Sequence, residues 1–216
     1  MKTTQILIAG FGGQGVLFAG KFLAYKGLVQ DKQVSWLPSY GPEMRGGTAN
    51  CSVIISDTPV GSPIITTPDV LVAMNLPSLT KFVDTVAPGG KIIIDSTLID
   101  AKVERSDVEV FYVPATQMAK DAGFGSLANM ILAGKVLKET DTVSYEGNKE
   151  TLEAFIPAKK ANLIDANCQA LGGLGLRIGG FCDLDIQHGD TSFLSNRSRS
   201  AGPGSWHQSG LPSWRE

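Results

Sequence analysis

The hydrophobic pattern of the chain alternates between short apolar runs and stretches with apolar residues at helical spacing. The first run, Gln5–Ala9, ends at a glycine-rich loop, and Val16–Val29 follows with apolar residues three or four positions apart. Lys32–Leu37 is a second apolar stretch, which Pro38 ends. This succession predicts a strand, a helix and a second strand, for which a right-handed parallel crossover is the usual connection.

The same alternation continues along the chain. We expect further strands at Thr48–Ser56, Asp69–Met74, Ile92–Asp95 and Val108–Val113. We expect helices at Pro77–Val86, Thr116–Ala122, Asn129–Leu137, Thr151–Ile156 and Lys159–Leu171. Together they predict an α/β fold: a single Rossmann-like, open, mostly parallel sheet with helices on both faces. The alternation within 48–56 and 108–113 leaves room for mixed strand directions in part of the sheet.

Composition narrows the class of protein. With 216 residues, 43% hydrophobic and 19% charged, the chain has the make-up of a globular protein with one well-cored domain. A net charge of -2 gives no basic surface for nucleic acid or for an anionic membrane. The apolar runs are much too short to span a bilayer, and the first residues lack the apolar core of a signal peptide. We therefore expect a cytoplasmic protein.

The amino-acid usage changes near Leu171. All thirteen lysines precede it, whereas the segment that follows has four of the six arginines, both histidines and two of the three tryptophans. We predict a domain over residues 1–170 and an atypical tail over 171–216. The pattern leaves two interpretations open: a flexible tail, or a segment that arose by read-through or a frameshift and was not selected with the domain.

Three cysteines, Cys51, Cys168 and Cys182, lie far apart. They form no C-x-x-C motif, so a disulfide framework or a zinc site is not indicated. An ordinary iron–sulfur cluster needs four thiolates, which this chain does not supply alone. Cys51 falls in an apolar strand pattern and is expected to be a small core residue.

The first glycine-rich loop carries the dinucleotide spacing G-x-G-x-x-G at Gly10, Gly12 and Gly15. Glycines let the backbone turn sharply, and the following helix directs unpaired N–H groups at the loop. A phosphate or pyrophosphate is the expected guest, and a tight turn without a ligand is the alternative. The acidic residue that would hold a ribose is missing, because the second strand ends in Pro38-Ser39. Lys21 lies about two turns into the helix, and its spacing does not decide between the loop and solvent.

A second glycine-rich loop, Ser39–Gly47, follows the second strand. Loops at the carboxyl ends of parallel strands line the same crevice, so both loops are expected at one edge of the sheet. Arg45, beside Gly46, suits contact with an anion or a partner. Residues before the tail include no histidine and no nucleophile elbow, which favours one subunit of a larger enzyme.

The segments "GFGGQGVLFAGKFLA", "LPSYGPEMRGGTANCSVIIS" and "ANMILAGKVL" resemble the gamma subunit of 2-oxoacid:ferredoxin (acceptor) oxidoreductases, over about Gln5 to Ala170. The resemblance implies an enzyme complex that converts a 2-oxoacid and coenzyme A to acyl-CoA, CO2 and reduced ferredoxin. The nearest members are the 2-oxoglutarate-type enzymes, and the pyruvate and branched-chain ketoacid (ketoisovalerate) types are similar. It implies alpha and beta subunits, and in some complexes a ferredoxin-like delta subunit. These partners hold thiamine diphosphate, Mg and the iron–sulfur clusters, and this subunit completes the coenzyme A cleft without acting alone.

Carried over by motif, the resemblance assigns a set of cofactor-binding residues and no catalytic or metal-binding residue. Gly10, Gly12, Gly13, Gln14 and Gly15 form the coenzyme A phosphate region, with Lys21 as a candidate charge partner. Ser39, Arg45, Gly46 and Asn129 complete the set. Three alternatives stay open: an indolepyruvate oxidoreductase small subunit, a freestanding nucleotide-binding protein, and a scaffold whose glycine loops only pack against partners.

Overall fold

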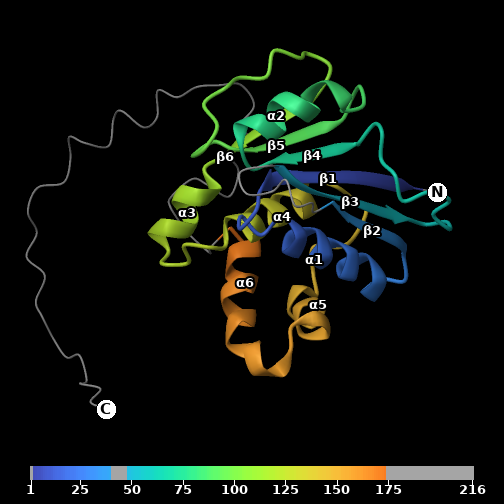
Figure 1. Cartoon of the computed structure of the whole chain (residues 1–216). Helices are drawn as coiled ribbons and strands as arrows, with labels where there is room; N and C mark the ends of the chain where they lie inside the picture. Colours follow the sequence, from blue (N-terminus) through green and yellow to red (C-terminus); the bar gives the residue numbers. More distant parts are fainter. Residues whose placement is uncertain (1, 40–47, 174–216) are drawn as a thin grey trace, which may run out of the picture. The chain divides into compact units, whose positions relative to one another are not determined.

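A six-stranded sheet with the order β2-β3-β1-β4-β5-β6 organises the computed structural model, which describes residues 2–39 and 48–173 (Figure 1). The strands are β1 (Thr3–Phe11), β2 (Gln33–Ser39), β3 (Thr48–Ser56), β4 (Val70–Ala73), β5 (Lys91–Asp95) and β6 (Glu109–Val113). The α-helices are α1 (Val16–Val29), α2 (Leu76–Phe82), α3 (Ala115–Asp121), α4 (Ala128–Glu139), α5 (Asn148–Phe155) and α6 (Ile164–Leu171). Two 3₁₀ segments, η2 (Val83–Thr85) and η3 (Ala158–Leu163), precede β5 and α6.

The strand directions confirm a mostly parallel sheet with a mixed part. β1 pairs in parallel with β4, which continues in parallel to β5 and β6. β3 is antiparallel to both β1 and β2. The second strand of the chain therefore runs in the same direction as the first, as the crossover predicts, but β3 lies between them. Mixed strand direction was expected for 48–56 and 108–113. The first segment forms the antiparallel strand β3, and the second forms the parallel strand β6.

One predicted helix needs a correction. The stretch from Lys159 to Leu171 is not one helix, because Ala158–Leu163 forms 3₁₀ turns and only Ile164–Leu171 is α-helical. Lys160 interrupts the first part with non-helical backbone angles. Apolar spacing alone does not separate these two forms, since both place side chains three or four residues apart on the same side.

Helices cover both faces of the sheet, as predicted. On one face α2 lies over a core of Leu7, Leu71, Ile92, Ile94 and Ile99. On the other face α1, α3, α4, α5 and α6 enclose the larger core, which includes Ile6, Ile8, Val53, Ile93 and Phe22. Gly20 lets α1 approach β3 closely, because a Cβ at this position would lie 2.3 Å from the sulfur of Cys51.

The carboxyl ends of the parallel strands meet at one edge, where β3 begins. Ser39 at the end of β2 pairs with Asn50, and Asn50 pairs with Ala9 near the end of β1. Ala9 pairs on its other side with Ala73, the last residue of β4. The loops that follow β1, β2 and β4 therefore leave the sheet at neighbouring positions, and this edge positions the candidate site.

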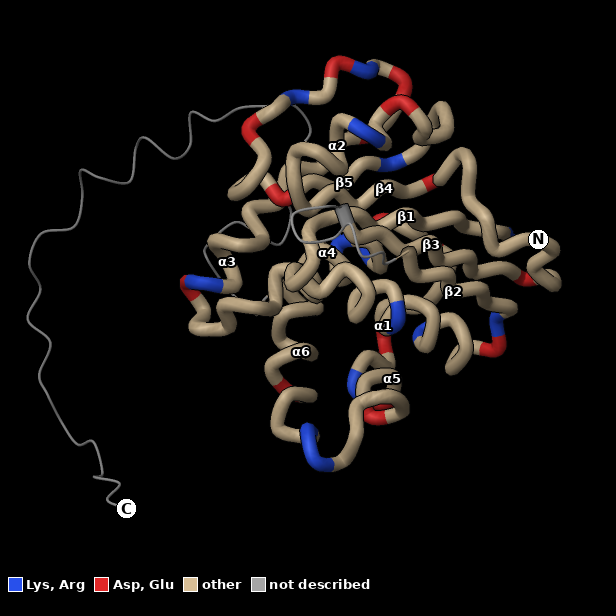
Figure 2. Tube along the Cα trace, in the orientation of Figure 1, with Lys and Arg blue, Asp and Glu red and all other residues tan. Residues whose placement is uncertain are grey.

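Charged residues lie mainly in turns and helices, and the central strands are largely uncharged (Figure 2). Within residues 2–39 and 48–173, no helix combines the length and the apolar character that crossing a membrane requires. The predicted boundary near Leu171 coincides with the end of α6. The tail from residue 174 onward lies outside the described residues, so the interpretation of 171–216 stays a prediction.

Candidate functional site

The turn from β1 into α1 is a short loop with a left-handed backbone at two glycines. Gly13 has φ 93° and Gly15 has φ 77°, values that L-residues with a side chain rarely adopt. The N–H of Gln14 donates to the carbonyl of Phe11 at 3.3 Å, and the N–H of Ala19 donates to that of Gly15 at 3.0 Å. The loop thus turns the chain within four residues and delivers it directly to the first turn of α1.

The N-terminus of α1 has backbone N–H groups without a hydrogen-bond partner in the helix. Gly15 is the N-cap residue, and no side chain of the described residues caps this end of the helix. The first N–H groups of a helix have no partner within the helix, and they carry the positive end of its dipole. The beginning of α1 is therefore suited to bind a negatively charged oxygen.

A hollow of about 250 Å³ lies beside this helix end. It is lined by Phe11, Gly12, Gly13, Gly15, Val16, Leu17, Phe18 and Ala49. Open space also faces Gly13, since a Cβ at this position would meet no atom within 4 Å. A ligand can therefore approach the backbone of the loop closely.

Gln14 holds the loop against the ends of two strands. Its Oε1 accepts a hydrogen bond from the N–H of Phe11 at 2.6 Å, and its Nε2 donates to the carbonyl of Met74 at 2.9 Å. Phe11 ends β1, and Met74 directly follows β4. The amide of Gln14 is thus fixed at both its oxygen and its nitrogen by backbone groups.

Asn129, the second residue of α4, approaches the loop from the other side. Its Nδ2 donates to the carbonyl of Gly15 at 3.1 Å, and the residue is only 3% exposed. Its Oδ1 is buried and has no hydrogen-bond partner among the described residues. The structure therefore brings together Asn129 and the first loop, which lie more than a hundred positions apart in the sequence.

The chain segments next to the loop contain no charged side chain. No Asp, Glu, Lys or Arg occurs in residues 5–20, 70–80 or 122–134 of the sequence. An anion at the loop would be held by backbone N–H groups and the helix dipole, without a carboxylate to repel it. Any ionic partner has to come from another segment or another chain.

Lys21 lies away from the glycines, on the side of α1 that faces α5. Its Nζ is 5.5 Å from the ring centre of Tyr25 and 5.6 Å from that of Phe155. These distances are within the range of cation–π attraction. The structure thus places the ammonium group of Lys21 against aromatic rings.

Ser39 is exposed at the end of β2, at the same edge as the first loop. Arg45 and Gly46 lie outside the described residues, so their predicted roles stay predictions. Sequence reasoning did not single out Phe11, which is 39% exposed and lines the hollow. The signal available in the sequence was an aromatic residue directly before the second glycine of the motif.

Cys51 is buried beside the beginning of α1, as predicted for a core residue. Its exposed fraction is 0%, and its Sγ lies 3.5 Å from the carbonyl oxygen of Val16. Burial raises the pKa of this thiol to about 12, against the smaller opposing effect of hydrogen bonds from Trp36 and Gly20. Cys51 therefore stays protonated at neutral pH and is no nucleophile.

A second hollow lies away from the site. A hollow of about 500 Å³ lies at the far end of α4, lined by Leu137, Lys138, Thr140, Asp141, Val143, Ser144 and Tyr145. It contains none of the predicted site residues. Among the described residues, no group of three or more His, Cys, Asp or Glu side chains is placed to hold a metal ion.

The sequence matches a known family over most of its length. The model of the pyruvate ferredoxin/flavodoxin oxidoreductase family matches residues 5–173. The chain is 44% identical over 168 residues to the ketoisovalerate oxidoreductase subunit VorA of Methanothermobacter thermautotrophicus, covering 77% of this chain and 35% of VorA. It is 35% identical over 160 residues to the 2-oxoglutarate synthase subunit KorC of Methanothermobacter marburgensis, covering 71% of this chain and 86% of KorC.

Solved structures show the same fold. The gamma subunit of a keto/oxoacid ferredoxin oxidoreductase from Geobacter sulfurreducens matches with a TM-score of 0.65 and 28% identity, over 79% of this chain and 98% of that one. A 2-oxoglutarate:ferredoxin oxidoreductase from Magnetococcus marinus matches with a TM-score of 0.70 and 24% identity, over 80% of this chain and 30% of that one. The domain thus occurs as nearly a whole subunit in some proteins and as about a third of a longer chain in others.

Proposed function

The chain belongs to the pyruvate ferredoxin/flavodoxin oxidoreductase family, and from this premise we propose that it is the gamma subunit of a 2-oxoacid:ferredoxin oxidoreductase. In that reaction a 2-oxoacid and coenzyme A give acyl-CoA and CO2, and the two electrons released reduce ferredoxin. The role of this subunit is to complete the cleft that binds coenzyme A. It does not act alone.

One observation carries the proposal: the uncapped beginning of α1 faces the hollow beside Gly12 and Gly13. A phosphate of coenzyme A fits here because free backbone N–H groups point at it and the surrounding segments bring no negative charge. The apolar walls at Leu17 and Phe18 suit the uncharged part of a ligand that extends away from the phosphate.

The cationic part of the cleft comes from outside the uncharged segments next to the loop. Within this chain we propose Arg45, which lies beside Gly46 in the segment after Ser39, because β2 ends at the same edge as β1. Partner subunits supply the rest. Asn129 supports the loop, and Lys21 is kept in the set only as a residue to test.

Chemistry at the 2-oxoacid falls to the partners. The segments around the loop carry no ionisable side chain that could take up or release a proton near neutral pH. We therefore propose that alpha and beta subunits hold thiamine diphosphate, Mg and the iron–sulfur clusters, with a ferredoxin-like delta subunit in some assemblies and ferredoxin as the acceptor. We place this complex in the cytoplasm.

The partner subunits select the 2-oxoacid. This chain indicates the substrate only through its similarity to subunits of known enzymes. 2-Oxoglutarate is the first candidate, supported by the 35% identity to KorC. Ketoisovalerate is the second, and the 44% identity to VorA favours it specifically. Rates measured with 2-oxoglutarate, pyruvate and ketoisovalerate on the purified complex decide between them.

The test of the cleft is amide hydrogen exchange in the assembled complex, with and without coenzyme A. We expect coenzyme A to slow exchange at residues 12–18 and to leave the strands of the far edge unchanged. A Gly13→Leu variant should raise the KM for coenzyme A by about tenfold or more, because its side chain fills the open space. Gly89→Leu is the matched control, since Gly89 has φ 75° and equally open surroundings but lies before β5.

Contrary results have distinct meanings. If coenzyme A turns over normally while exchange at 12–18 is unchanged, the loop only packs against partners and the scaffold interpretation replaces this one. If NAD(H) or NADP(H), but not coenzyme A, raises the melting temperature of the isolated chain, a freestanding nucleotide-binding protein is the better interpretation. Turnover of indolepyruvate alone would assign the chain to that enzyme instead.

A further inference from the structure

The glycines and amides of the first loop divide into two groups with different tasks. We propose that Gln14 and Asn129 are positioning residues, which hold the loop in its binding shape before a ligand arrives and do not contact the ligand. Gly10 and Gly15 make room for these two side chains, and within the loop it is the backbone around Gly12 and Gly13 that faces the ligand. This inference rests on the proposal that coenzyme A binds at the loop.

Gln14 fixes the start of the loop. Its Oε1 is 2.6 Å from the N of Phe11 and its Nε2 is 2.9 Å from the carbonyl oxygen of Met74. One amide thereby connects the ends of β1 and β4, two strands that are neighbours in the sheet. Both polar atoms of the side chain point at backbone groups, so the amide plane is set by the fold.

Gly10 makes this arrangement possible. A Cβ at Gly10 would lie 2.7 Å from Oε1 of Gln14, 2.9 Å from Cβ of Met74 and 3.0 Å from Cγ2 of Val16. Real Cβ contacts are longer, so a side chain here would displace Gln14. The first glycine of the fingerprint is therefore required by the packing of Gln14, Met74 and Val16, with no ligand involved.

Asn129 fixes the end of the loop in the same way. Its Nδ2 donates to the carbonyl of Gly15 at 3.1 Å, and a Cβ at Gly15 would lie 2.5 Å from that nitrogen. Asn129 is 3% exposed, on the first turn of α4, and so connects this helix to the N-cap of α1. By contrast, a Cβ at Gly13 would meet nothing within 4 Å.

The test compares loop order and ligand affinity in the same variants. Gln14→Met and Asn129→Leu remove the hydrogen bonds at similar side-chain length. In the full chain without any ligand, amide exchange at residues 11–17 should become about tenfold faster, since each variant loses one or two hydrogen bonds that hold the loop. In the assembled complex the KM for coenzyme A should rise by about tenfold while kcat at saturating coenzyme A stays near that of the wild type.

Two further variants separate positioning from general damage. Gln14→Glu keeps the acceptor for Phe11 and loses the donor to Met74, so its ligand-free exchange should fall between wild type and Gln14→Met. Its KM for coenzyme A should rise at least as much as that of Gln14→Met, because the new carboxylate repels a phosphate at the loop. Gln117→Met is the control, because Gln117 also makes a side-chain hydrogen bond, to Asp121 at 2.6 Å, but on exposed α3. It should leave both measurements unchanged.

The proposal is overturned if Gln14→Met weakens coenzyme A binding while the ligand-free exchange of the loop stays at the wild-type rate, because Gln14 would then contact the ligand itself. It is also overturned if neither quantity changes. A wild-type complex in which coenzyme A does not protect the loop would instead refute the proposed function, and the ligand-free exchange rates would still measure the two positioning contacts. Gly10→Ala, whose Cβ would crowd Gln14 together with Met74 and Val16, gives a second measure of loop loosening.

Discussion

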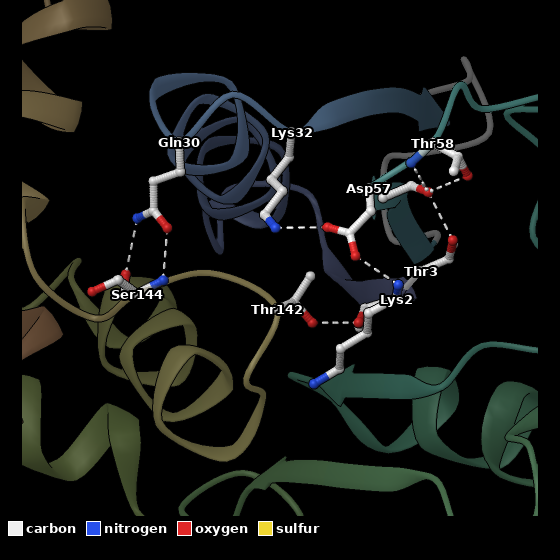
Figure 3. Close-up of polar contacts among 10 residues, drawn as sticks. Lys2, Thr3, Gln30, Lys32, Asp57, Thr58, Thr142 and Ser144 are labelled. Atoms are coloured by element: carbon white, nitrogen blue, oxygen red, sulfur yellow. Dashed lines mark hydrogen bonds and ion pairs between the residues drawn. The ribbon is translucent and has the colours of Figure 1, made fainter.

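The two ends of α1 treat their polar groups in opposite ways. At the C-terminal end, the buried Lys26 donates a hydrogen bond to the carbonyl of Glu146, and Gln30 exchanges two hydrogen bonds with the backbone of Ser144, at 3.1 and 2.7 Å. Figure 3 shows the Gln30–Ser144 pair beside the ion pair between Lys32 and Asp57. At the N-terminal end, Gly15 caps the helix without a side chain.

This difference between the two ends of α1 supports the proposal that a ligand binds at the N-terminal end. At the C-terminal end the polar groups form hydrogen bonds within the chain and join α1 to the segment before α5, so this end stabilises the fold. At the N-terminal end backbone N–H groups remain without a partner in the helix, beside a hollow. A stable fold does not require unpaired donors at this place. Damage to the first end should lower stability, and damage to the second should lower ligand affinity.

The largest effect is expected from Lys26→Ala. Lys26 is 1% exposed, and its loss leaves a cavity and an unpaired carbonyl at Glu146. We expect the free energy of unfolding of the full chain to fall by about 3 kcal/mol, measured by urea titration. Lys26→Met, which keeps most of the volume, should lose less than half as much. The affinity for coenzyme A should be the same for wild type and Lys26→Ala. A large loss of affinity would contradict the purely stabilising role of this end of the helix.

Gly15→Ala breaks the other end. The left-handed backbone costs an alanine about 1 kcal/mol or more, and its Cβ would push Asn129 away from the loop. The KM for coenzyme A should rise by about tenfold, while stability falls by about 2 kcal/mol. Gly89→Ala, with φ 75° and open surroundings, is the control for backbone strain alone and should leave the KM unchanged. If both variants behave alike, the contact with Asn129 has no role in binding.

Lys21 lies between the two ends of α1, and Lys21→Ala should change stability and the affinity for coenzyme A only slightly. Removing the contacts with Tyr25 and Phe155 should cost about 0.5 kcal/mol of stability. Isothermal titration of the complex with coenzyme A should show an affinity within about twofold of the wild type. A tenfold loss would show that Lys21 turns toward the loop in the complex and is a charge partner of the ligand.

The smallest and most gradual effect is a pH dependence of the C-terminal end. Burial lowers the pKa of Lys26 from its ordinary 10.5, with Glu150 and Glu146 opposing the shift. The unfolded chain then binds the proton more tightly than the folded chain, so stability should rise with pH between the lowered pKa and 10.5. The unfolding free energy of wild type minus that of Lys26→Met, measured from pH 7 to 10.5, should therefore increase.

A flat or falling difference would contradict this sign. The subtraction also removes the effect of Cys51, whose raised pKa of about 12 works in the opposite direction. The folded chain holds the thiol proton more tightly there, so stability is lost as pH rises from the ordinary value of 9.0 towards 12.

Most elements were predictable from the sequence because they depend on local patterns. The apolar run at Gln5–Ala9 and the helical spacing of Val16–Val29 lie within β1 and α1. The helix at Lys159–Leu171 was only half right, since its first part forms 3₁₀ turns. The insertion of β3 between β1 and β2 was not predictable, because strand order depends on pairing between segments far apart in the chain.

Local patterns were enough to predict that a glycine-rich loop follows the first strand and leads into a helix, since glycine spacing and apolar periodicity are local properties of the chain. The stretches 5–20, 70–80 and 122–134 are visibly uncharged in the sequence, but their meeting at the loop is a property of the folded chain. Which glycines face open space and which make room for Gln14 and Asn129 also depends on the folded structure. The reason is physical: the side chains and carbonyls that surround the loop come from β4 and α4, and their approach is set by packing across the sheet.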